Sequence, residues 1–321
     1  MRIVRTLHRP PLEARGAAIA LGNFDGVHHG HRAVLSAAMA AARAGGMAAA
    51  ALTFEPHPRQ LFRPEGPPFR LTPFDLKARL LAEFGLDVLF VARFDRAFSL
   101  QPAADFVADV LVRDLGAAHV VAGYDFVFGH GRGGDAELLR RAGRDHGFAV
   151  TIAEPAGAGG AAFASSTVRD HLRDGEPAQA AAVLGRFWEI GGRVQRGAGR
   201  GHGLGVPTAN LRPPAGVLHP RFGVYAARAR IGGESKWRPG VASVGIPPMF
   251  EAVAPLLEIH LFDFDAVLYG QPICVALIEY LRPQERFESV DTLRAAMGAD
   301  ADWARRLLAD PAYRTGRFAP A

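Results

Sequence analysis

Hydrophobic residues in the first half of the chain follow two alternating patterns. Short continuous apolar runs are typical of buried strands, and the longer stretches between them repeat apolar residues at helical spacing. The patterns predict strands at 17–21, 47–54, 88–91, 120–121 and 148–153, and helices at 30–44, 74–84 and 135–144. Thr72 is expected to cap the helix at 74–84, with Pro73 in its first turn. This alternation predicts a parallel sheet covered by helices, with ligands beyond the carboxyl ends of the strands.

The pattern changes in the second half. Strand-length apolar runs at 188–194, 224–229, 256–264 and 273–281 are separated by Gly and Pro, and one helical stretch at 290–308 follows them. Several short strands with turn residues between them predict a small antiparallel barrel or sandwich. A chain of 321 residues suits two hydrophobic cores. We therefore expect two domains, residues 1–182 and 183–321, with the boundary inside 180–186.

Composition narrows the functional classes. Hydrophobic residues make up 49% of the chain and charged residues 21%, which is typical of a folded protein. The net charge of +5 is spread without runs of like charge, so it indicates phosphate-bearing small molecules rather than nucleic acid as partners. Cys274 is the single cysteine and lies in an apolar run, so we expect a buried thiol. Neither a leader nor a membrane span is apparent, and we expect a cytoplasmic monomer or weak homo-oligomer.

The segment Gly22–His31, Gly-Asn-Phe-Asp-Gly-Val-His-His-Gly-His, is the most specific pattern of the first half. It lies where a strand ends and a helix begins, and free backbone N–H groups at such a place bind phosphates. His28 and His31 share one face of the first turn, and Gly30 leaves room for a phosphate near the backbone. A turn with surface histidines is the alternative, and it explains a single histidine better than the whole pattern.

This segment resembles the HxGH signature of the nucleotidyltransferase superfamily. The resemblance implies that His28 and His31 donate hydrogen bonds to ATP phosphates and stabilise charge developing on the α-phosphate. Residues 165–169 resemble the Ser-Ser-Thr-x-x-Arg motif of the superfamily, with Ala164 where its first serine usually stands; the same serines would also serve as an ordinary helix cap. The implied site comprises catalytic His28, His31 and Arg169, with ATP contacts from Gly22, Asn23, Phe24, Asp25, Gly30, Ser165 and Ser166.

Two loops after predicted strands resemble the flavin and adenine pockets of the bacterial bifunctional riboflavin kinase/FAD synthetase family. They are residues 53–58, Thr-Phe-Glu-Pro-His-Pro, and 123–129, Gly-Tyr-Asp-Phe-Val-Phe-Gly. Loops that merely pack Pro and Phe are the alternative, but a flat isoalloxazine ring stacks on aromatic side chains. The resemblance implies flavin contacts from Phe54, Pro56, Pro58, Asp125 and Phe126. Residues 129–134 fit G-x-G-x-x-G without a βαβ unit around them, so we expect a mobile loop beside the ATP site.

The stretch 197–210 is the most specific pattern of the second half. Its five glycines in nine residues predict a loop that wraps phosphates. Thr208 and Asn210 place two neutral oxygens on one side of an extended chain, where they suit a Mg²⁺ ion that also holds ATP. The stretch resembles the riboflavin kinase module, which implies metal contacts from Thr208 and Asn210, ATP contacts from Gly199, Gly201 and Gly205, and a general base at Glu258.

The kinase resemblance has three departures. His202, Val206 and Pro248 stand where the family usually has Arg, Phe and Thr. For Glu258, a strand residue that faces solvent is the alternative to a base. The resemblance nevertheless covers nearly the whole chain, from about residue 15 to about residue 310.

Taken together, the motifs imply a Rossmann-like nucleotidyltransferase domain followed by a β-barrel riboflavin kinase domain. The activity expected is ATP-dependent phosphorylation of riboflavin to FMN, then adenylylation of FMN to FAD with release of diphosphate, with Mg²⁺ as cofactor. Two alternatives stay open. The barrel could only bind flavin as a sensor, or the first domain could act on another phosphorylated substrate.

Overall fold

The computed structural model describes residues 1–158, 161–196, 207–246 and 255–313. The chain divides into two compact units, residues 1–66 with 72–164 and residues 67–71 with 165 onward. Each unit is described by itself. The helices between residues 165 and 184 belong to the second unit in this division. Its main segment therefore begins at residue 165, whereas the sequence predicted a boundary after residue 182.

A six-stranded sheet forms the centre of the first unit, and its strands lie in the order β1-β4-β3-β2-β5-β6. Every neighbouring pair in it is parallel. The middle strands are built from small and branched apolar residues that are buried on both faces, as the predicted alternation requires. The strands are β1 (Arg2–Val4), β2 (Ala18–Leu21), β3 (Ala49–Glu55), β4 (Val88–Arg93), β5 (His119–Gly123) and β6 (Ala149–Ala153).

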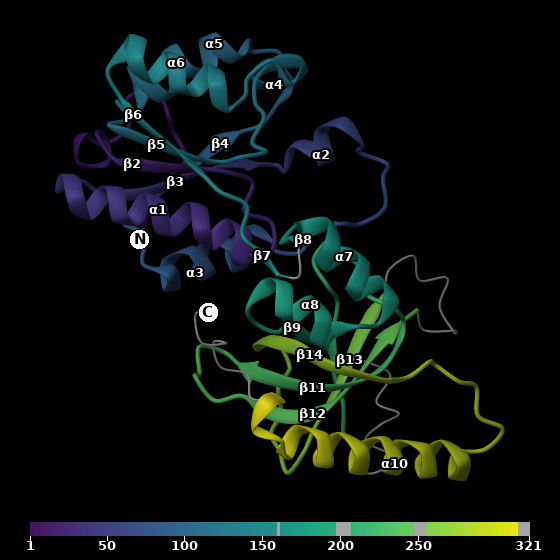
Figure 1. Cartoon of the computed structure of the whole chain (residues 1–321). Helices are drawn as coiled ribbons and strands as arrows, with labels where there is room; N and C mark the ends of the chain where they lie inside the picture. The colour runs from purple at the N-terminus through teal and green to yellow at the C-terminus, as the bar shows by residue number, and fades with distance from the viewer. Residues whose placement is uncertain (159–160, 197–206, 247–254, 314–321) are drawn as a thin grey trace. The chain divides into compact units, whose positions relative to one another are not determined.

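Helices cover both faces of this sheet. Figure 1 shows α1 and α3 on one face and α4, α5 and α6 on the other, and a separate hydrophobic cluster fills each interface. The helices are α1 (His29–Gly45), α2 (Pro58–Phe62), α3 (Phe74–Phe84), α4 (Arg96–Ser99), α5 (Ala103–Asp105), η2 (Phe106–Asp114) and α6 (Ala136–His146). Short elements complete the unit: η1 (Leu12–Ala14), η3 (His130–Arg132), β7 (Gly157–Ala158) and β8 (Ala161–Ala162).

The strand order reverses between β2 and β5. From β2 the chain runs outward through β3 to β4, and it later adds β5 and β6 on the other side of β2. In open parallel sheets, ligands bind at the carboxyl edge beside such a reversal. The loop after β2 leads into the two histidines at the start of α1, and the loop after β5 carries Phe126 and Phe128, so both motif segments flank this position.

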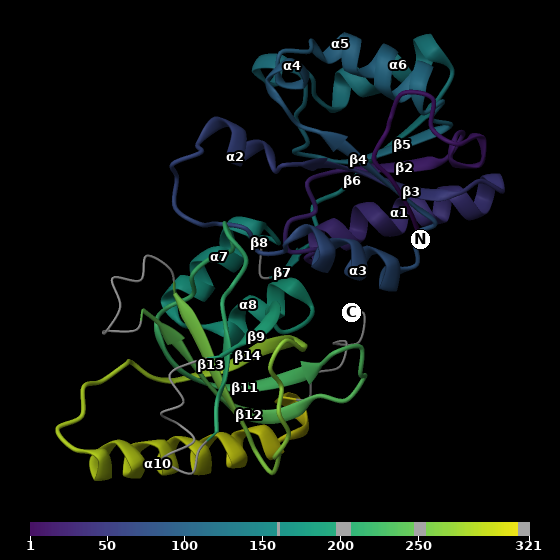
Figure 2. The ribbon, with the colours of Figure 1, turned by 180° about the vertical axis from the view of Figure 1, so that it is seen from behind.

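The second unit is a closed barrel with the strand order β10-β13-β12-β11-β14-β9, and every pair in it is antiparallel. Its strands are β9 (Glu189–Gln195), β10 (Ala209–Leu211), β11 (Gly223–Ile231), β12 (Arg238–Gly245), β13 (Leu256–Leu261) and β14 (Pro272–Arg282). The helices packed with it are α7 (Ser165–Asp174), α8 (Pro177–Leu184) and α10 (Val290–Ala309), followed by η4 (Pro311–Tyr313). Figure 2 shows α10 alongside β11 and β12.

The predicted fold class is confirmed, because a parallel α/β sheet precedes an antiparallel barrel with a C-terminal helix. Cys274 is half-buried, less enclosed than its apolar run predicts, and its Sγ donates to Glu189 Oε2 at 3.0 Å. Within the part of the chain that the structure describes, none of the helices has the length and hydrophobicity to cross a bilayer.

Candidate active sites

The loop after β2 is held in an irregular conformation by a buried carboxylate. Phe24 and Val27 both adopt positive φ angles, 51° and 47°, which non-glycine residues rarely do. Asp25 is 2% exposed, and its Oδ1 accepts hydrogen bonds from the Thr72 backbone N–H at 2.9 Å and the Thr72 hydroxyl at 3.1 Å. Gly26 N–H donates to the same hydroxyl at 2.9 Å. Thr72 therefore fixes the histidine loop.

Thr72 does not cap the helix as predicted. The N-cap of α3 is Pro73, without a side-chain cap, because the Thr72 hydroxyl is engaged by Asp25 and Gly26 instead. The predicted role was wrong because the local signal for a cap could not reveal a partner 47 residues earlier in the chain.

The two motif histidines lie together at the start of α1. Their rings stack with centroids 3.7 Å apart, and His28 is 5% exposed. His28 is the N-cap residue, and its Nδ1 accepts a long hydrogen bond from His31 N–H at 3.4 Å. An accepting Nδ1 carries no proton, so the neutral ring carries its proton on Nε2. The cap thus leaves His28 as a hydrogen-bond donor through Nε2.

His29, between the two motif histidines, has a different environment. Its ring packs against Phe163 with centroids 5.2 Å apart. Burial, and secondarily the nearby Arg32 charge, lower the pKa of His29 below its ordinary value. Its packing therefore favours the neutral form of the ring.

Gly30 is required by the protein's own packing. A Cβ there would lie 2.9 Å from the Phe163 carbonyl oxygen and 3.1 Å from the His28 ring. Gly30→Ala should therefore lower the thermal midpoint of the first unit and slow the reaction that depends on His28, although Ala is the better helix former by about 1 kcal/mol. Thermal unfolding together with rate measurement checks this, and an alanine variant more stable than the wild type would contradict it.

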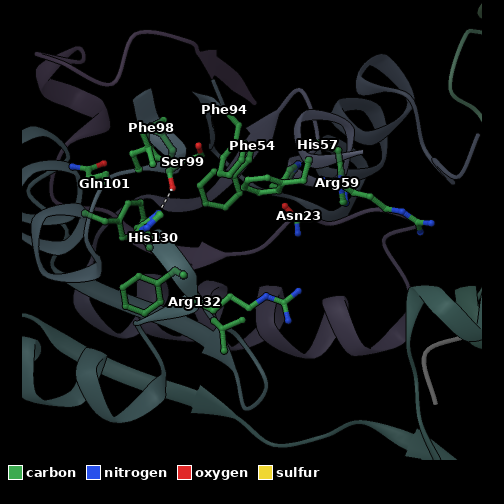
Figure 3. Close-up of a pocket in the computed structure, with 18 of the residues that line it drawn as sticks. Asn23, Phe54, His57, Arg59, Phe94, Phe98, Ser99, Gln101, His130 and Arg132 are labelled. Carbon is green, nitrogen blue, oxygen red and sulfur yellow. Dashed lines mark hydrogen bonds between the residues drawn. The ribbon is translucent and has the colours of Figure 1, made fainter. Parts of the chain in front are cut away.

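A cavity of about 950 Å³ opens at the carboxyl edge of the same sheet. Phenylalanines from several elements line it: Phe54, Phe62, Phe94, Phe98, Phe106, Phe126 and Phe128. Phe54 lies at the centre of this group, with its ring centroid 6.0 Å from Phe94 and 6.0 Å from Phe98. Figure 3 shows these three rings gathered on one side of the cavity, with Arg132 opposite them. The volume and lining suit a large, flat, mostly apolar molecule.

Polar residues surround this aromatic group. The cationic ones are Arg59, Arg63, Arg96 and Arg132, with His57 and His130 beside them. Asn23 also lines the cavity, and its Oδ1 is buried without a hydrogen-bond partner among the described residues. An apolar floor with cationic groups around it suits an aromatic ring that carries an anionic substituent.

The structure brings together some of the predicted flavin contacts. Phe54, Pro58 and Phe126 line the cavity, whereas Pro56 and Asp125 do not. Pro56 and Asp125 are both exposed. Their roles stay predictions.

The glycine-rich loop after Phe128 also lines the cavity. His130 N–H donates to Gln101 O at 2.8 Å, and Phe128 and Gly134 exchange two backbone hydrogen bonds. Gly129, with φ of 72°, packs so closely that a Cβ there would lie 2.5 Å from Ala103 Cα. The loop, predicted to lie beside the ATP site, thus forms part of the aromatic cavity.

The serine–arginine motif falls in the second unit. Ser165 and Ser166 begin α7. Arg169 Nε donates to Phe69 O at 2.8 Å, and its guanidinium lies 5.5 Å from the centre of the Phe69 ring. The predicted contacts of this motif with ATP stay predictions.

In the barrel, the register places the predicted kinase residues side by side. Asn210 of β10 pairs with Glu258 of β13, and Glu258 pairs on its other side with Ser243 of β12. Directly opposed residues of antiparallel strands point to the same face. Their neighbours Leu257 and Ile259 are buried inside the barrel, so this face is the outer one. Glu258 is exposed there and Asn210 is 7% exposed.

A histidine holds the segment that leads into β10. His260, two residues beyond Glu258 on the same strand, has its Nδ1 2.9 Å from the carbonyl oxygen of Pro207. This contact fixes the backbone next to Thr208, which is half-buried. The predicted phosphate-loop glycines Gly199, Gly201 and Gly205 lie outside the described residues, as do the departures His202, Val206 and Pro248.

The residues on this face fit a hard cation held jointly with phosphates. The Oδ1 of Asn210 is buried and has no hydrogen-bond partner among the described residues. Buried polar oxygens in proteins normally accept a hydrogen bond or bind an ion. Neutral carboxamide and hydroxyl oxygens are groups that Mg²⁺ accepts when nucleotide phosphates supply the other ligands.

The comparisons assign both units to known families. Residues 11–167 match the FAD synthetase family, and residues 184–308 match the riboflavin kinase family. The bifunctional riboflavin kinase/FMN adenylyltransferase of Escherichia coli K12 is 39% identical, covering 95% of this chain and 97% of that protein. That of Pseudomonas fluorescens is 38% identical, covering 98% and 100%. A crystal structure of a Streptococcus pneumoniae protein, named there a macrolide-efflux protein, is 27% identical, covering 95% and 99%, with a TM-score of 0.85.

An FAD synthetase domain followed by a riboflavin kinase domain defines a two-domain enzyme that makes flavin nucleotides. The chain belongs to the family of bifunctional riboflavin kinases/FMN adenylyltransferases. The predicted family is confirmed, and so is the prediction of an enzyme that has a riboflavin kinase domain and an FAD synthetase domain.

Sequence reasoning missed several groups beside these sites. Ser243 was not singled out, because its strand reads as Arg-Pro-Gly followed by small residues. Lys77 was treated only as part of a helix, and its partners lie on a strand more than 20 residues earlier. A lysine inside an otherwise apolar helix face was the one available signal.

Proposed function

We propose that the chain makes FMN and then FAD, with the paired histidines of the first unit serving FAD formation and the carboxylate of the second unit serving FMN formation. The observation that carries the proposal is that each unit holds a chemically different group of candidate catalytic residues. The first has paired histidines beside an aromatic cavity, and the second has a carboxylate opposite a buried carboxamide. Chromatography of the flavins formed from riboflavin, ATP and Mg²⁺, with a parallel sample given FMN, tests it. FMN followed by FAD is the expected result.

For FAD formation, the cavity binds the isoalloxazine ring of FMN, and the cationic groups around it attract the phosphate. His28 and His31 bind the ATP phosphates at the start of α1, where free N–H groups add to the positive potential. The attacking FMN phosphate is already an anion, so no general base is needed. His28 Nε2 donates to the phosphate oxygens as charge builds in the transition state. We assign Arg169, Ser165 and Ser166 to the same triphosphate.

Phe54→Ala tests the cavity. Phe54 is 7% exposed and central among the lining rings, so its removal takes away stacking area from a bound flavin. We expect the KM for FMN in FAD formation to rise roughly 10-fold, because one aromatic contact contributes about 1 kcal/mol beyond its area. Riboflavin phosphorylation should be unchanged. Steady-state kinetics with FMN and riboflavin in turn checks this, and an unchanged KM for FMN would contradict the assignment.

For FMN formation, the reacting group of riboflavin is a hydroxyl, which must lose its proton. Glu258 is the carboxylate on the outer face of the barrel, and we assign it as the general base. Thr208 and Asn210 would hold Mg²⁺, which neutralises charge on the ATP phosphates when bound. His260 keeps Thr208 in place through the Pro207 carbonyl.

The sensor alternative makes a different prediction in the same chromatography. A barrel that only binds flavin would give FAD from added FMN and nothing from riboflavin. The departures at His202, Val206 and Pro248 motivate this alternative. We further propose that the enzyme acts in the cytoplasm on small molecules, without nucleic acid or membrane, as a monomer or weak homo-oligomer, which size-exclusion chromatography with light scattering would test.

A further inference from the structure

A buried ion pair joins α3 to β3 in the first unit, and neither of the proposed reactions uses it. The Lys77 side chain, on α3, is 0% exposed, and its Nζ lies 2.9 Å from Glu55 Oε1, whose side chain is 13% exposed. The same Nζ donates to Thr53 Oγ1 at 3.1 Å. Burying an ammonium group is costly unless it is paired and hydrogen-bonded, as Lys77 is.

This pair lies at the carboxyl end of β3, at the edge where the cavity opens. Thr53 and Glu55 face α3, and Phe54 between them points to the opposite face and into the cavity. The Lys77 ammonium group can only donate, so Thr53 Oγ1 accepts from it and donates its own proton to Asn23 O, at 3.1 Å. Asn23 also lines the cavity. Lys77 therefore holds two segments of the cavity wall from beneath.

The segment before α3 holds the neighbouring histidine loop independently. Thr72, two residues before α3 begins and five residues before Lys77, binds Asp25 and Gly26. The helix and the segment leading into it thus make two separate attachments. One fixes the loop that leads to His28, and the other fixes the wall formed by Asn23 and Phe54.

Stability alone is a poor reason for this pair. Replacing a buried ion pair by uncharged groups of similar volume is often neutral or stabilising, whereas removing one partner is strongly destabilising. A role in positioning would explain why a charged residue is buried here. The Lys77 ammonium group donates directed hydrogen bonds to two residues of β3, Thr53 and Glu55, whereas an apolar side chain would fix the orientation of neither.

We propose that Lys77 is a positioning residue for FMN adenylylation. It acts through Thr53 and Glu55 to keep Asn23 and Phe54 in the geometry that aligns the bound FMN. The inference rests on the proposed function, in which this cavity takes FMN.

The test compares Lys77→Met with the double variant Lys77→Met/Glu55→Gln in the full-length enzyme. The single variant removes the ammonium partner of the largely buried Glu55 carboxylate and should lose thermal stability. The double variant should recover most of that stability. Its KM for FMN in FAD formation should nevertheless rise and its kcat/KM for FMN should fall by roughly 10- to 100-fold, because the reactants are misaligned. Its KM for ATP should change much less than its KM for FMN, because Thr72 still holds the loop that leads to His28 and, of the ATP contacts implied by the sequence, only Asn23 is held through Lys77.

A loss of folded protein would lower the rate without changing either KM, so the separation between the two substrates reports positioning. The matched control is Arg79→Met/Glu83→Gln, which removes an ion pair of 3.1 Å from the same helix on a more exposed face. It should leave FAD formation unchanged. A double variant that regains stability together with wild-type kinetics would overturn the inference. Absence of FAD formation in the wild type would instead overturn the proposed function.

Discussion

His28→Ala is expected to reduce FAD formation roughly 100- to 1,000-fold while leaving riboflavin phosphorylation at the wild-type rate. His28 stacks with His31 at the start of α1, and because its Nδ1 accepts the cap hydrogen bond, Nε2 is the donor of the ring. Loss of that donor removes stabilisation needed in the transition state, so the effect should fall on kcat. Rates with FMN and with riboflavin, measured on one preparation, check both halves of the expectation.

His29→Ala is the matched control for this prediction. His29 lies in the same helical turn but packs on Phe163 instead of stacking with the pair. It should retain FAD formation. The kinase rate reports the integrity of the second unit in both variants. Equal losses in the two variants would show that the turn, and not the His28 donor, accounts for the effect.

Glu258→Gln is expected to have the reciprocal effect. The amide keeps the shape of the side chain but cannot accept a proton, so phosphorylation of riboflavin should fall roughly 100- to 10,000-fold. FAD formation from supplied FMN should be unaffected. Because Glu258 is exposed on the outer face of the barrel, the substitution should leave thermal unfolding almost unchanged.

A suitable control is Glu234→Gln, which alters an exposed glutamate that pairs with Arg238 elsewhere in the same unit. It should phosphorylate riboflavin normally. If Glu258→Gln also phosphorylated riboflavin at the wild-type rate, Glu258 would not be the general base. It would then be a strand residue that simply faces solvent.

The regular elements were largely readable because their signals are local. The helix predicted at 74–84 coincides with α3, and the strands predicted at 88–91 and 273–281 fall inside β4 and β14. The elements that were missed have weak local signals. β10 has three residues, and β12 begins with Arg-Pro-Gly, so it is pairing with the strands on both sides that makes them strands. η2 also went unpredicted, although one side of it packs in the core.

The sequence by itself determined the order of the two domains, the family, and the segments from which both sites come. Motifs such as Gly22–His31 are contiguous, so their chemistry can be read without coordinates. Only the tertiary structure decided which distant groups meet. It placed Glu258 opposite Asn210, turned Thr72 from a helix cap into a partner of Asp25, and buried Lys77 beneath the cavity wall. Such contacts depend on strand register and helix packing, which arise from the summed burial of many residues. No short segment of the sequence therefore predicts them.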